Sequence, residues 1–285
     1  MHKAYKFRLE PTDKQAKALA YIAGSCRFVY NHFLSIQKKL YEERKATGNK
    51  AIKLLNRNKM SSRLTQLKKE EETKWLKNSI AQSLQQTIMD LDDAIINWLQ
   101  RKKGFPRFKK KGVRDSFRIP EPPKLDDRTN RVYVPKVGWI KFRKSRDIKG
   151  ITRSFTISRE GEHWYISILT KQQEEQLLHP NFNTCVGIDL GVKHFATLST
   201  GEHIDLPDFS KLYKQLASTQ KQYSHKKKGS KNQRKVGARM VKIHRKIRNK
   251  RLDSLHKISN AIVKRYGTVV MEDLKIINMM KSAKG

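Results

Sequence analysis

Two acidic side chains in this sequence follow short apolar runs that are typical of strands. Asp189 ends the run at residues 185–188 (CVGI), and Glu272 ends the run at residues 268–271 (TVVM). Carboxylate oxygens that are held rigidly on neighbouring strands are the hard, anionic ligands that Mg²⁺ and Mn²⁺ take in proteins. A pair of such ions activates a water and stabilises the leaving oxygen in phosphodiester hydrolysis. We therefore predict that Asp189 and Glu272 are catalytic, metal-ligating residues for Mg²⁺ or Mn²⁺.

A single carboxylate at a strand end is equally often an ordinary turn residue, and it is the pairing that favours a metal site. Asp205, Asp208 and Asp273 lie near the two runs and are weaker candidates. A carboxylate in such a position also serves as a helix cap or completes a turn.

The charge of the chain indicates the class of its partner. The sequence contains 63 Lys+Arg against 26 Asp+Glu, a formal net charge of +37. A field this positive repels itself unless a polyanion neutralises it, so nucleic acid is the expected partner. A membrane surface is the competing interpretation. However, no apolar run is long enough to span a bilayer, and the N-terminal residues lack the apolar segment of a signal peptide. We expect no membrane partner and a cytoplasmic, nucleoid-associated prokaryotic protein.

The two cysteines bear on metal binding and on redox compartment. Cys26 and Cys185 are far apart in the sequence and form no C-x-x-C pair. This pattern favours a reduced intracellular chain without a cysteine-based zinc site. We therefore expect no zinc.

The longest basic stretch covers residues 209–252, which contain 16 Lys+Arg and no Asp or Glu. It reads either as a solvated helix face or basic tail, or as a surface that follows a phosphate backbone. Apolar residues at helical spacing in its second half favour an ordered helix with one basic side. We expect nucleic-acid contacts from a basic turn between two helices and from the helix that follows it: Lys226, Lys227, Lys228, Arg245 and Lys246.

A second basic segment, residues 104–111 (GFPRFKKK), interleaves aromatic and basic side chains. Such a pattern suits nucleic acid, because bases stack on the rings while phosphates pair with the cations. The two rings, Phe105 and Phe108, could equally anchor a turn to the core. The cations are assigned to phosphates: Arg107, Lys109, Lys110 and Lys111.

The periodicity of apolar residues divides the chain into three blocks. Residues 3–9 alternate like a half-buried strand, and Thr12 with Gln15 predicts a capping box. Residues 11–103 read as mostly helical, with a break at Gly24 and a loop at residues 47–49. Residues 104–178 contain short alternating strands with a hairpin turn at Gly161, and the first strand could join their sheet. Residues 179–285 contain strands near 185–190, 194–199, 203–206 and 268–271 around long helices. The predicted fold class is α+β, multidomain.

In this order and spacing, several short motifs resemble the TnpB (OrfB) family of transposon-encoded proteins, which are related to the type V CRISPR effectors and widely labelled transposases. The resemblance runs from end to end. It rests on residues 25–31 (SCRFVYN), 75–76 (WL), 104–108 (GFPRF), 186–191 (VGIDLG) and 272–274 (EDL).

The resemblance implies an RNA-guided DNA endonuclease, with guide RNA and target DNA as partners. It implies a β-barrel wedge domain from residues 1–10 plus 104–178, an inserted helical recognition domain at 11–103, and a RuvC-like, RNase H-type domain at 179–285 with a basic helical insert at 209–265. Asp189 matches the family's first catalytic aspartate and Glu272 its catalytic glutamate. Nucleic-acid contacts are implied for Arg27 in the first motif and for Ser61 and Gln85, near positions that read a short DNA motif beside the target.

The sequence departs from the family pattern at its C-terminal end. Family members continue with a C-x-x-C…C-x-x-C zinc module and a third RuvC segment that carries the last catalytic aspartate, and residues 1–285 contain neither. We therefore expect a C-terminally truncated RuvC-like domain and an RNA-guided nuclease that lacks part of its site. The alternatives are a cleavage-deficient RNA- and DNA-binding module, acting as a repressor or transposition accessory, and a plain DNA-binding transposase.

Overall fold

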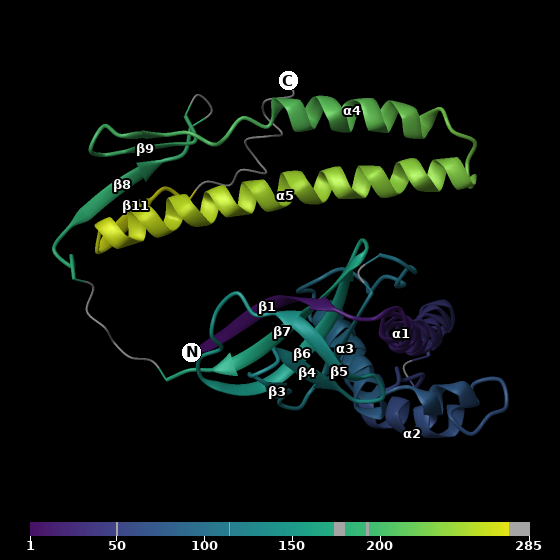
Figure 1. Cartoon of the computed structure of the whole chain (residues 1–285). Coiled ribbons are helices and arrows are strands. Elements are labelled where there is room, and N and C mark those ends of the chain that lie inside the picture. The colour runs from purple at the N-terminus through teal and green to yellow at the C-terminus, as the bar shows by residue number, and fades with distance from the viewer. Residues whose placement is uncertain (50, 114, 174–179, 192–193, 274–285) are drawn as a thin grey trace. The chain divides into compact units, whose positions relative to one another are not determined.

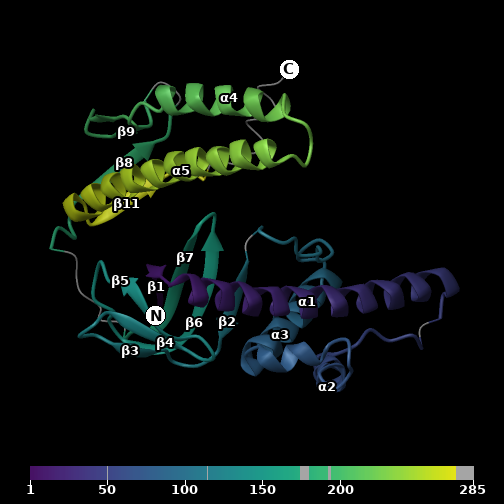
Figure 2. The ribbon, with the colours of Figure 1, turned by 45° about the vertical axis from the view of Figure 1, so that its right-hand side comes forward.

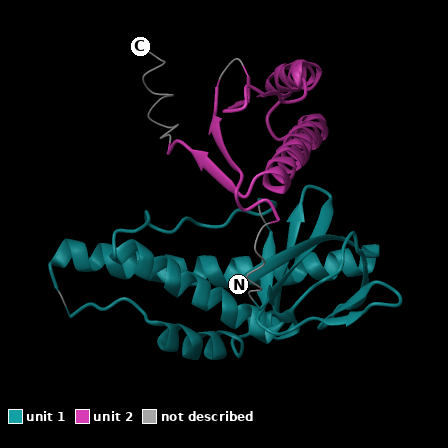
Figure 3. Cartoon of the chain, turned by 90° about the vertical axis from the view of Figure 1, so that its left-hand side faces the viewer, with its two compact units in different colours: residues 1–174 teal, residues 175–285 magenta. Residues whose placement is uncertain are grey.

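The structure, a computed structural model, describes residues 1–49, 51–113, 115–173, 180–191 and 194–273. The chain divides into two compact units, which we call the N-terminal unit (Met1–Glu174) and the C-terminal unit (Glu175–Gly285). Figure 3 shows them in separate colours. Each unit combines a β-sheet with long helices, so the fold is mixed α and β.

The N-terminal unit begins with strand β1 (His2–Glu10), which leads directly into helix α1 (Asp13–Thr47). The predicted capping box is present. The Gln15 N–H donates to Thr12 Oγ1 at 3.4 Å, and the Thr12 N–H donates to Gln15 Oε1 at 3.0 Å. The helix ends at Gly48, whose φ of 66° gives the left-handed cap that glycine adopts without steric cost.

The predicted helix break at Gly24 is wrong, because α1 is continuous through this residue (Figure 2). The apolar residues before and after Gly24 keep one helical register, and both groups are buried against the same core. Burial of these side chains outweighs the roughly 1 kcal/mol by which glycine disfavours a helix interior.

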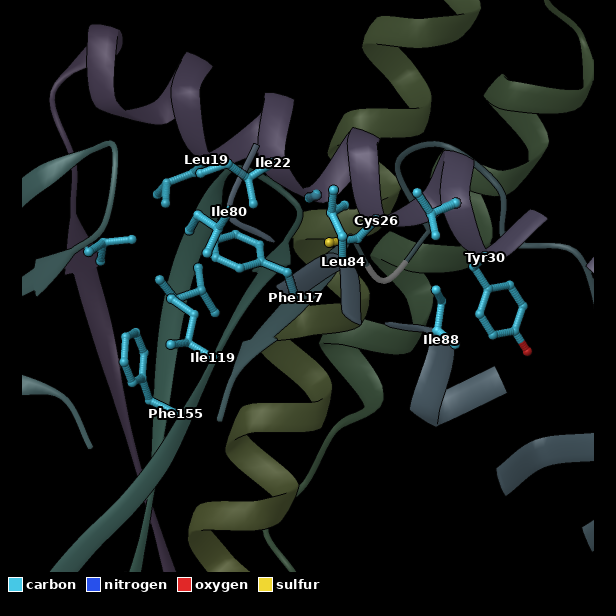
Figure 4. Close-up of a cluster of buried hydrophobic side chains, with 14 of the residues drawn as sticks. Leu19, Ile22, Cys26, Tyr30, Ile80, Leu84, Ile88, Phe117, Ile119 and Phe155 are labelled. Carbon is cyan, nitrogen blue, oxygen red and sulfur yellow. The ribbon is translucent and has the colours of Figure 1, made fainter. Parts of the chain in front are cut away.

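Three further helical segments complete the helical part of this unit. They are α2 (Arg57–Leu67), the short 3₁₀-helix η1 (Lys74–Asn78) and α3 (Ala81–Leu99). Figure 4 shows side chains of α1 and α3 meeting those of the neighbouring sheet. The labelled members of this core are Leu19, Ile22, Cys26, Tyr30, Ile80, Leu84, Ile88, Phe117, Ile119 and Phe155.

The sheet of the N-terminal unit has seven antiparallel strands in the order β2-β6-β7-β1-β5-β4-β3. Strand β1 lies inside the sheet between β5 and β7, although the three α-helices separate it from the other strands in sequence. The predicted hairpin turn at Gly161 joins β6 to β7, and Gly161 has a φ of 62°. The remaining strands are β2 (Ser116–Ile119), β3 (Lys124–Asp126), β4 (Arg131–Val134), β5 (Gly138–Arg143), β6 (Ile151–Glu160) and β7 (His163–Lys171).

The C-terminal unit has a four-stranded sheet in the order β10-β9-β8-β11. Its elements are β8 (Cys185–Asp189), β9 (Ala196–Leu198), β10 (His203–Ile204), α4 (Ser210–Ser224), α5 (Lys231–Arg265) and β11 (Thr268–Met271). Ile258 and Ile262 of α5 pack against Val186, Ile188 and Leu198, so the C-terminal part of α5 covers one face of the sheet. Figure 1 shows α4 beside α5, where Leu216, Ile243 and Ile247 form a separate apolar cluster.

The basic turn predicted between two helices is present at residues 225–230, between α4 and α5. Ser230 caps α5 by accepting a hydrogen bond from the Gln233 N–H at 3.0 Å. Among the described residues, no helix is long and apolar enough to cross a membrane.

Candidate metal and nucleic-acid sites

The structure brings Asp189 and Glu272 together at one edge of the C-terminal sheet. Strands β8 and β11 are parallel neighbours, and their register pairs Val270 with Gly187 and Met271 with Ile188. The next residue of each strand is Glu272 and Asp189. Because side chains alternate along a strand, Asp189 lies on the face opposite Ile188 and thus opposite α5.

Both carboxylates line one open pocket of about 450 Å³. The two residues are exposed, so a hydrated cation could reach them without displacing other side chains. The pocket is lined by Gly187, Ile188, Asp189, Thr197, Leu198, Ser199, Val270, Met271 and Glu272. This arrangement supplies hard anionic oxygens from rigid elements, which are the donors that Mg²⁺ and Mn²⁺ prefer.

A cluster of hydrogen bonds at the start of β8 sets its register with β11. The Thr184 carbonyl accepts from the N–H groups of Gly267 at 3.1 Å and Thr268 at 2.9 Å. The Asn181 side chain donates to the carbonyls of Lys264 at 3.3 Å and Arg265 at 3.1 Å, and thereby caps the C-terminal end of α5. The loop before β8 thus ties the helix end and β11 together, and this fixes Glu272 beside Asp189.

Strand β9 completes the pocket on the other side of β8. The Gly187 N–H donates to Ser199 Oγ at 3.1 Å, and the Ser199 N–H donates to the Gly187 carbonyl at 2.9 Å. In the ladder, Asp189 pairs with Thr197. Sequence reasoning missed Thr197 of β9 and Ser199, which directly follows β9, as pocket residues, because nothing in so short a segment indicates its register.

The three weaker acidic candidates have separate positions. Asp205 contacts His194, with distances of 3.1 and 3.3 Å from its carboxylate oxygens to His194 Nδ1. Asp208 accepts the Ser210 N–H at 2.7 Å at the start of α4, and hydrogen bonds from Ser210 lower the pKa of Asp208 below its ordinary value. Asp273 directly follows Glu272. Across the described ranges, no group of three or more His, Cys, Asp or Glu residues is arranged to hold a metal ion.

The basic residues of the C-terminal unit are mostly exposed. Lys226, Lys227 and Lys228 lie in the turn between α4 and α5, and Lys246 is exposed on α5, whereas Arg245 is half-buried. The absence of Asp and Glu from residues 209–252 means that these cations have no acidic partner within the stretch. Their role as nucleic-acid contacts stays a prediction, and the structure shows only that most of these cations are exposed.

The segment 104–113, which we call the strap, is fastened to α1 at Lys109. Asn31 holds both backbone groups of Lys109: its side chain accepts from the Lys109 N–H at 2.8 Å and donates to the Lys109 carbonyl at 2.9 Å. Lys109 Nζ lies 4.0 Å from the centroid of the Tyr30 ring, and desolvation lowers the pKa of Lys109. The strap therefore has a defined path along the helix.

Two cations predicted to contact nucleic acid have partners within the protein. Arg27 forms an ion pair with Asp115 at 2.6 Å, and Lys109 packs on Tyr30. The other three basic residues of the predicted set remain exposed on the strap: Arg107, Lys110 and Lys111.

The two rings of the strap differ in their surroundings. Phe105 packs against Trp98, with ring centroids 4.9 Å apart, and against Tyr41 at 6.4 Å. Phe108 is 47% exposed. The sequence left open whether the two rings anchor a turn to the core or stack on bases. Phe105 anchors the strap to the core, whereas Phe108 is exposed to solvent, where a base could stack on it.

Ser61 and Gln85 lie on different helices, and the structure brings them together. The Ser61 hydroxyl on α2 donates to Gln85 Oε1 on α3 at 2.8 Å. Both side chains are half-buried, and their reading of DNA stays a prediction.

Two protein-family models match the chain. One, OrfB_IS605, is described as a probable transposase and matches residues 167–283. The other, HTH_OrfB_IS605, is described as a helix-turn-helix domain and matches residues 1–46. In this structure residues 1–46 form strand β1 and most of the single continuous helix α1.

Curated relatives match almost the whole chain. "Putative RNA-guided DNA endonuclease InsQ" of Escherichia coli (strain K12) is 41% identical over 283 residues, covering 99% of this chain and 68% of the relative. A protein of Streptomyces pristinaespiralis with the same description, without the name InsQ, is 30% identical over 298 residues, covering 99% of this chain and 69% of the relative. The chain thus spans about two thirds of the length of these proteins. On this identity and coverage, the chain belongs to the OrfB (TnpB) family of transposases and RNA-guided DNA endonucleases.

Proposed function

We propose that this protein acts in RNA-guided, metal-dependent DNA cleavage, with guide RNA and target DNA as its partners. The observation that carries the proposal is the placement of Asp189 and Glu272 on neighbouring parallel strands, in one pocket of a chain whose net charge is +37. The names of the relatives support RNA guidance and DNA as the substrate.

The residues of the pocket fit Mg²⁺ or Mn²⁺ by their chemistry. Asp189 and Glu272 would hold the ions through exposed carboxylate oxygens. When bound, such ions supply an activated water and stabilise the leaving oxygen. Zinc is not proposed, because Cys26 is buried in the N-terminal unit and Cys185 is in the C-terminal unit.

In this proposal, basic and polar side chains outside the pocket bind and orient the nucleic acid. Exposed cations neutralise phosphates along the turn at residues 226–228, on α5 and on the strap. Ser61 and Gln85 would read the short DNA motif beside the target. Arg27 would act indirectly, because it pairs with Asp115, whose carboxylate also accepts the N–H of Gly112 in the strap at 3.2 Å.

The domain arrangement we propose follows the resemblance. Residues 1–10 with 104–178 would form the wedge-like β domain, residues 11–103 the recognition domain, and residues 179–285 a RuvC-like domain. Two features support it: β1 pairs with strands that follow the helices, and β8 pairs in parallel with β11 and antiparallel with β9.

We propose further that residues 1–285 by themselves cut DNA poorly. A two-metal site needs more ligands than two carboxylates provide, and residues 274–285 contain no Asp or Glu. The second candidate function is a binding module without cleavage, which would need only the strong positive charge of the chain, a formal net +37.

The deciding experiment measures binding and cutting separately. The purified chain should carry nucleic acid that resists DNase and is removed by RNase, and a DNA-only cargo would refute the guide-RNA proposal. Programmed cutting of a matched DNA target should be weak with residues 1–285. Recovery on addition of the part of a relative that this chain does not cover, abolished by Asp189→Ala, supports the nuclease. The absence of cutting under either condition supports the binding module.

A further inference from the structure

The row of residues that contains Asp189 continues across the sheet to a pair of histidines. In the ladder, Asp189 pairs with Thr197 of β9, and Thr197 pairs with His203 of β10. Paired residues point to the same face of a sheet, and neighbouring strands are about 4.8 Å apart. His203 therefore lies roughly 10 Å from Asp189, on the face that carries the carboxylates.

The Nδ1 atoms of the two histidines, His194 and His203, each contact a side chain of the C-terminal unit. His203 Nδ1 lies 3.2 Å from Thr197 Oγ1. His194 Nδ1 contacts the Asp205 carboxylate at 3.1 Å. The two imidazole rings stack, with centroids 4.4 Å apart and planes inclined by 16°. Within the described residues, the Nε2 atoms of both rings have no hydrogen-bond partner, so the outer nitrogen of each ring is left for a ligand.

Hydrogen-bond chemistry assigns a different role to each ring. A carboxylate only accepts, so His194 Nδ1 carries the hydrogen in its contact with Asp205. In the tautomer in which the Thr197 hydroxyl donates to His203 Nδ1, the ring hydrogen lies on Nε2. His203 is then the donor to a ligand, while His194, oriented by Asp205, supports the His203 ring from one side.

A phosphodiester is the ligand that this position suits. The carboxylates are the proposed site of the scissile phosphate, and successive phosphates of one DNA strand recur about every 3.4 Å along the axis of B-form DNA. A strand held at Asp189 and Glu272 therefore brings a further phosphate within reach of a group roughly 10 Å away in the same row.

We infer that His203, supported by His194, is a positioning residue that binds a backbone phosphate of the strand whose scissile phosphate lies at Asp189 and Glu272. This inference rests on the proposed function, because it takes the carboxylate pocket as the place where the strand is held. It adds Thr197 and Asp205 as residues that orient the two imidazoles.

The test measures Mn²⁺ affinity of the full chain by electron paramagnetic resonance, with and without a single-stranded DNA tetranucleotide. In the unsubstituted chain the tetranucleotide should tighten Mn²⁺ binding, because it bridges the metal and His203. His203→Asn keeps a group near Nδ1 and removes Nε2. It should reduce this tightening by about tenfold, the size of a hydrogen bond to a charged group, and leave Mn²⁺ affinity without DNA unchanged.

Three variants make the result specific. His203→Gln places an amide donor near the position of Nε2 and should restore most of the tightening. His256→Asn removes an exposed histidine on α5 and should change nothing. Asp189→Asn should abolish Mn²⁺ binding in both arms. If His203→Asn lost Mn²⁺ affinity without DNA, His203 would be a metal ligand and the inference would be overturned. The inference would also be overturned if the tetranucleotide tightened Mn²⁺ binding equally in His203→Asn and in the unsubstituted chain.

A second measurement keeps the inference testable if the carboxylates bind no Mn²⁺, an outcome that would refute the proposed metal site. In histidine-labelled protein without metal, the tetranucleotide should shift the imidazole NMR signals of His203 and His194 and leave that of His256 in place. Unmoved signals for His203 would overturn the inference.

Discussion

The carbonyl of Thr184 accepts the N–H of Gly267 at 3.1 Å, and this contact is one of several that join the end of α5 to the residues just before β8. The chain passes so closely here that a Cβ on Gly267 would lie 2.4 Å from the Asn181 carbonyl oxygen and 2.6 Å from Phe182 Cα. Because β11 begins at the next residue, the position of Glu272 relative to Asp189 depends on this approach.

Gly267→Ala should therefore displace β11 and weaken metal binding without touching either carboxylate. Overpacking of this kind typically destabilises by roughly 1–3 kcal/mol. Thermal unfolding and Mn²⁺ titration should both show the loss. The matched control is Gly24→Ala, where the nearest atom would be Arg27 Nη2 at 3.7 Å. That change lies inside α1 and should stabilise the protein by roughly 0.5–1 kcal/mol. Unchanged Mn²⁺ affinity in Gly267→Ala would contradict the role of this contact.

Replacing Lys226, Lys227 and Lys228 together by Gln should reduce the salt dependence of nucleic-acid binding. If the whole chain neutralises about 8 phosphates, the slope of log affinity against log salt on duplex DNA is about −7, and three lost contacts change it by about 2.7. Sequence preference should stay the same, because phosphate contacts carry no sequence information. Binding titrations across a range of salt concentrations measure the slope.

A control with the same change in net charge separates contact from overall charge. Lys74, Lys144 and Lys257 are each paired with an acidic side chain, at 2.5, 2.9 and 2.7 Å respectively. Their combined replacement by Gln should alter the slope much less. Equal slopes for the two triple variants would show that the turn at 226–228 is not a binding site.

Phe105→Ala should lower stability, whereas Phe108→Ala should weaken single-strand binding. Phe105 packs on Trp98 and Tyr41, so its loss should lower the free energy of unfolding, by no more than the roughly 3–5 kcal/mol of a fully buried Phe→Ala change. Phe108 is 47% exposed, and its loss should leave stability almost unchanged. Stacking of a base on an aromatic ring contributes roughly 1–3 kcal/mol, so Phe108→Ala should weaken single-strand binding without changing the salt slope. Wild-type affinity in this variant would rule out stacking at Phe108.

The two cysteines should differ sharply in reactivity. Burial raises the pKa of the Cys26 thiol to about 11, whereas Cys185 is exposed. A raised pKa in the folded state means that protonated Cys26 stabilises the fold fully below pH 9, and that this contribution is lost as pH rises toward 11. At pH 8, a thiol reagent should modify Cys185 rapidly and Cys26 only after unfolding. Mass spectrometry identifies the modified residue, and rapid labelling of Cys26 in the Cys185→Ser variant would contradict its burial.

Short-range signals in the sequence correctly predicted several local features. The capping box of Thr12 and Gln15, the turn at Gly161 and the basic turn before α5 depend on hydrogen bonds between residues a few positions apart. Such features can be read from the sequence because the groups that form them are neighbours in the chain. The two apolar runs ending in Asp189 and Glu272 were equally visible.

Other features depend on contacts between distant segments. The break expected at Gly24 is absent because burial of α1 against the core, and not local propensity, decides the helix. The partners of Arg27 and Lys109 became known only when the strap was placed on α1. The sequence by itself therefore determined which carboxylates are candidates for metal binding and which basic side chains are candidates for phosphate binding. Tertiary structure decided the row from Glu272 to His203, because register across a sheet is set by hydrogen bonds between strands that are far apart in the chain.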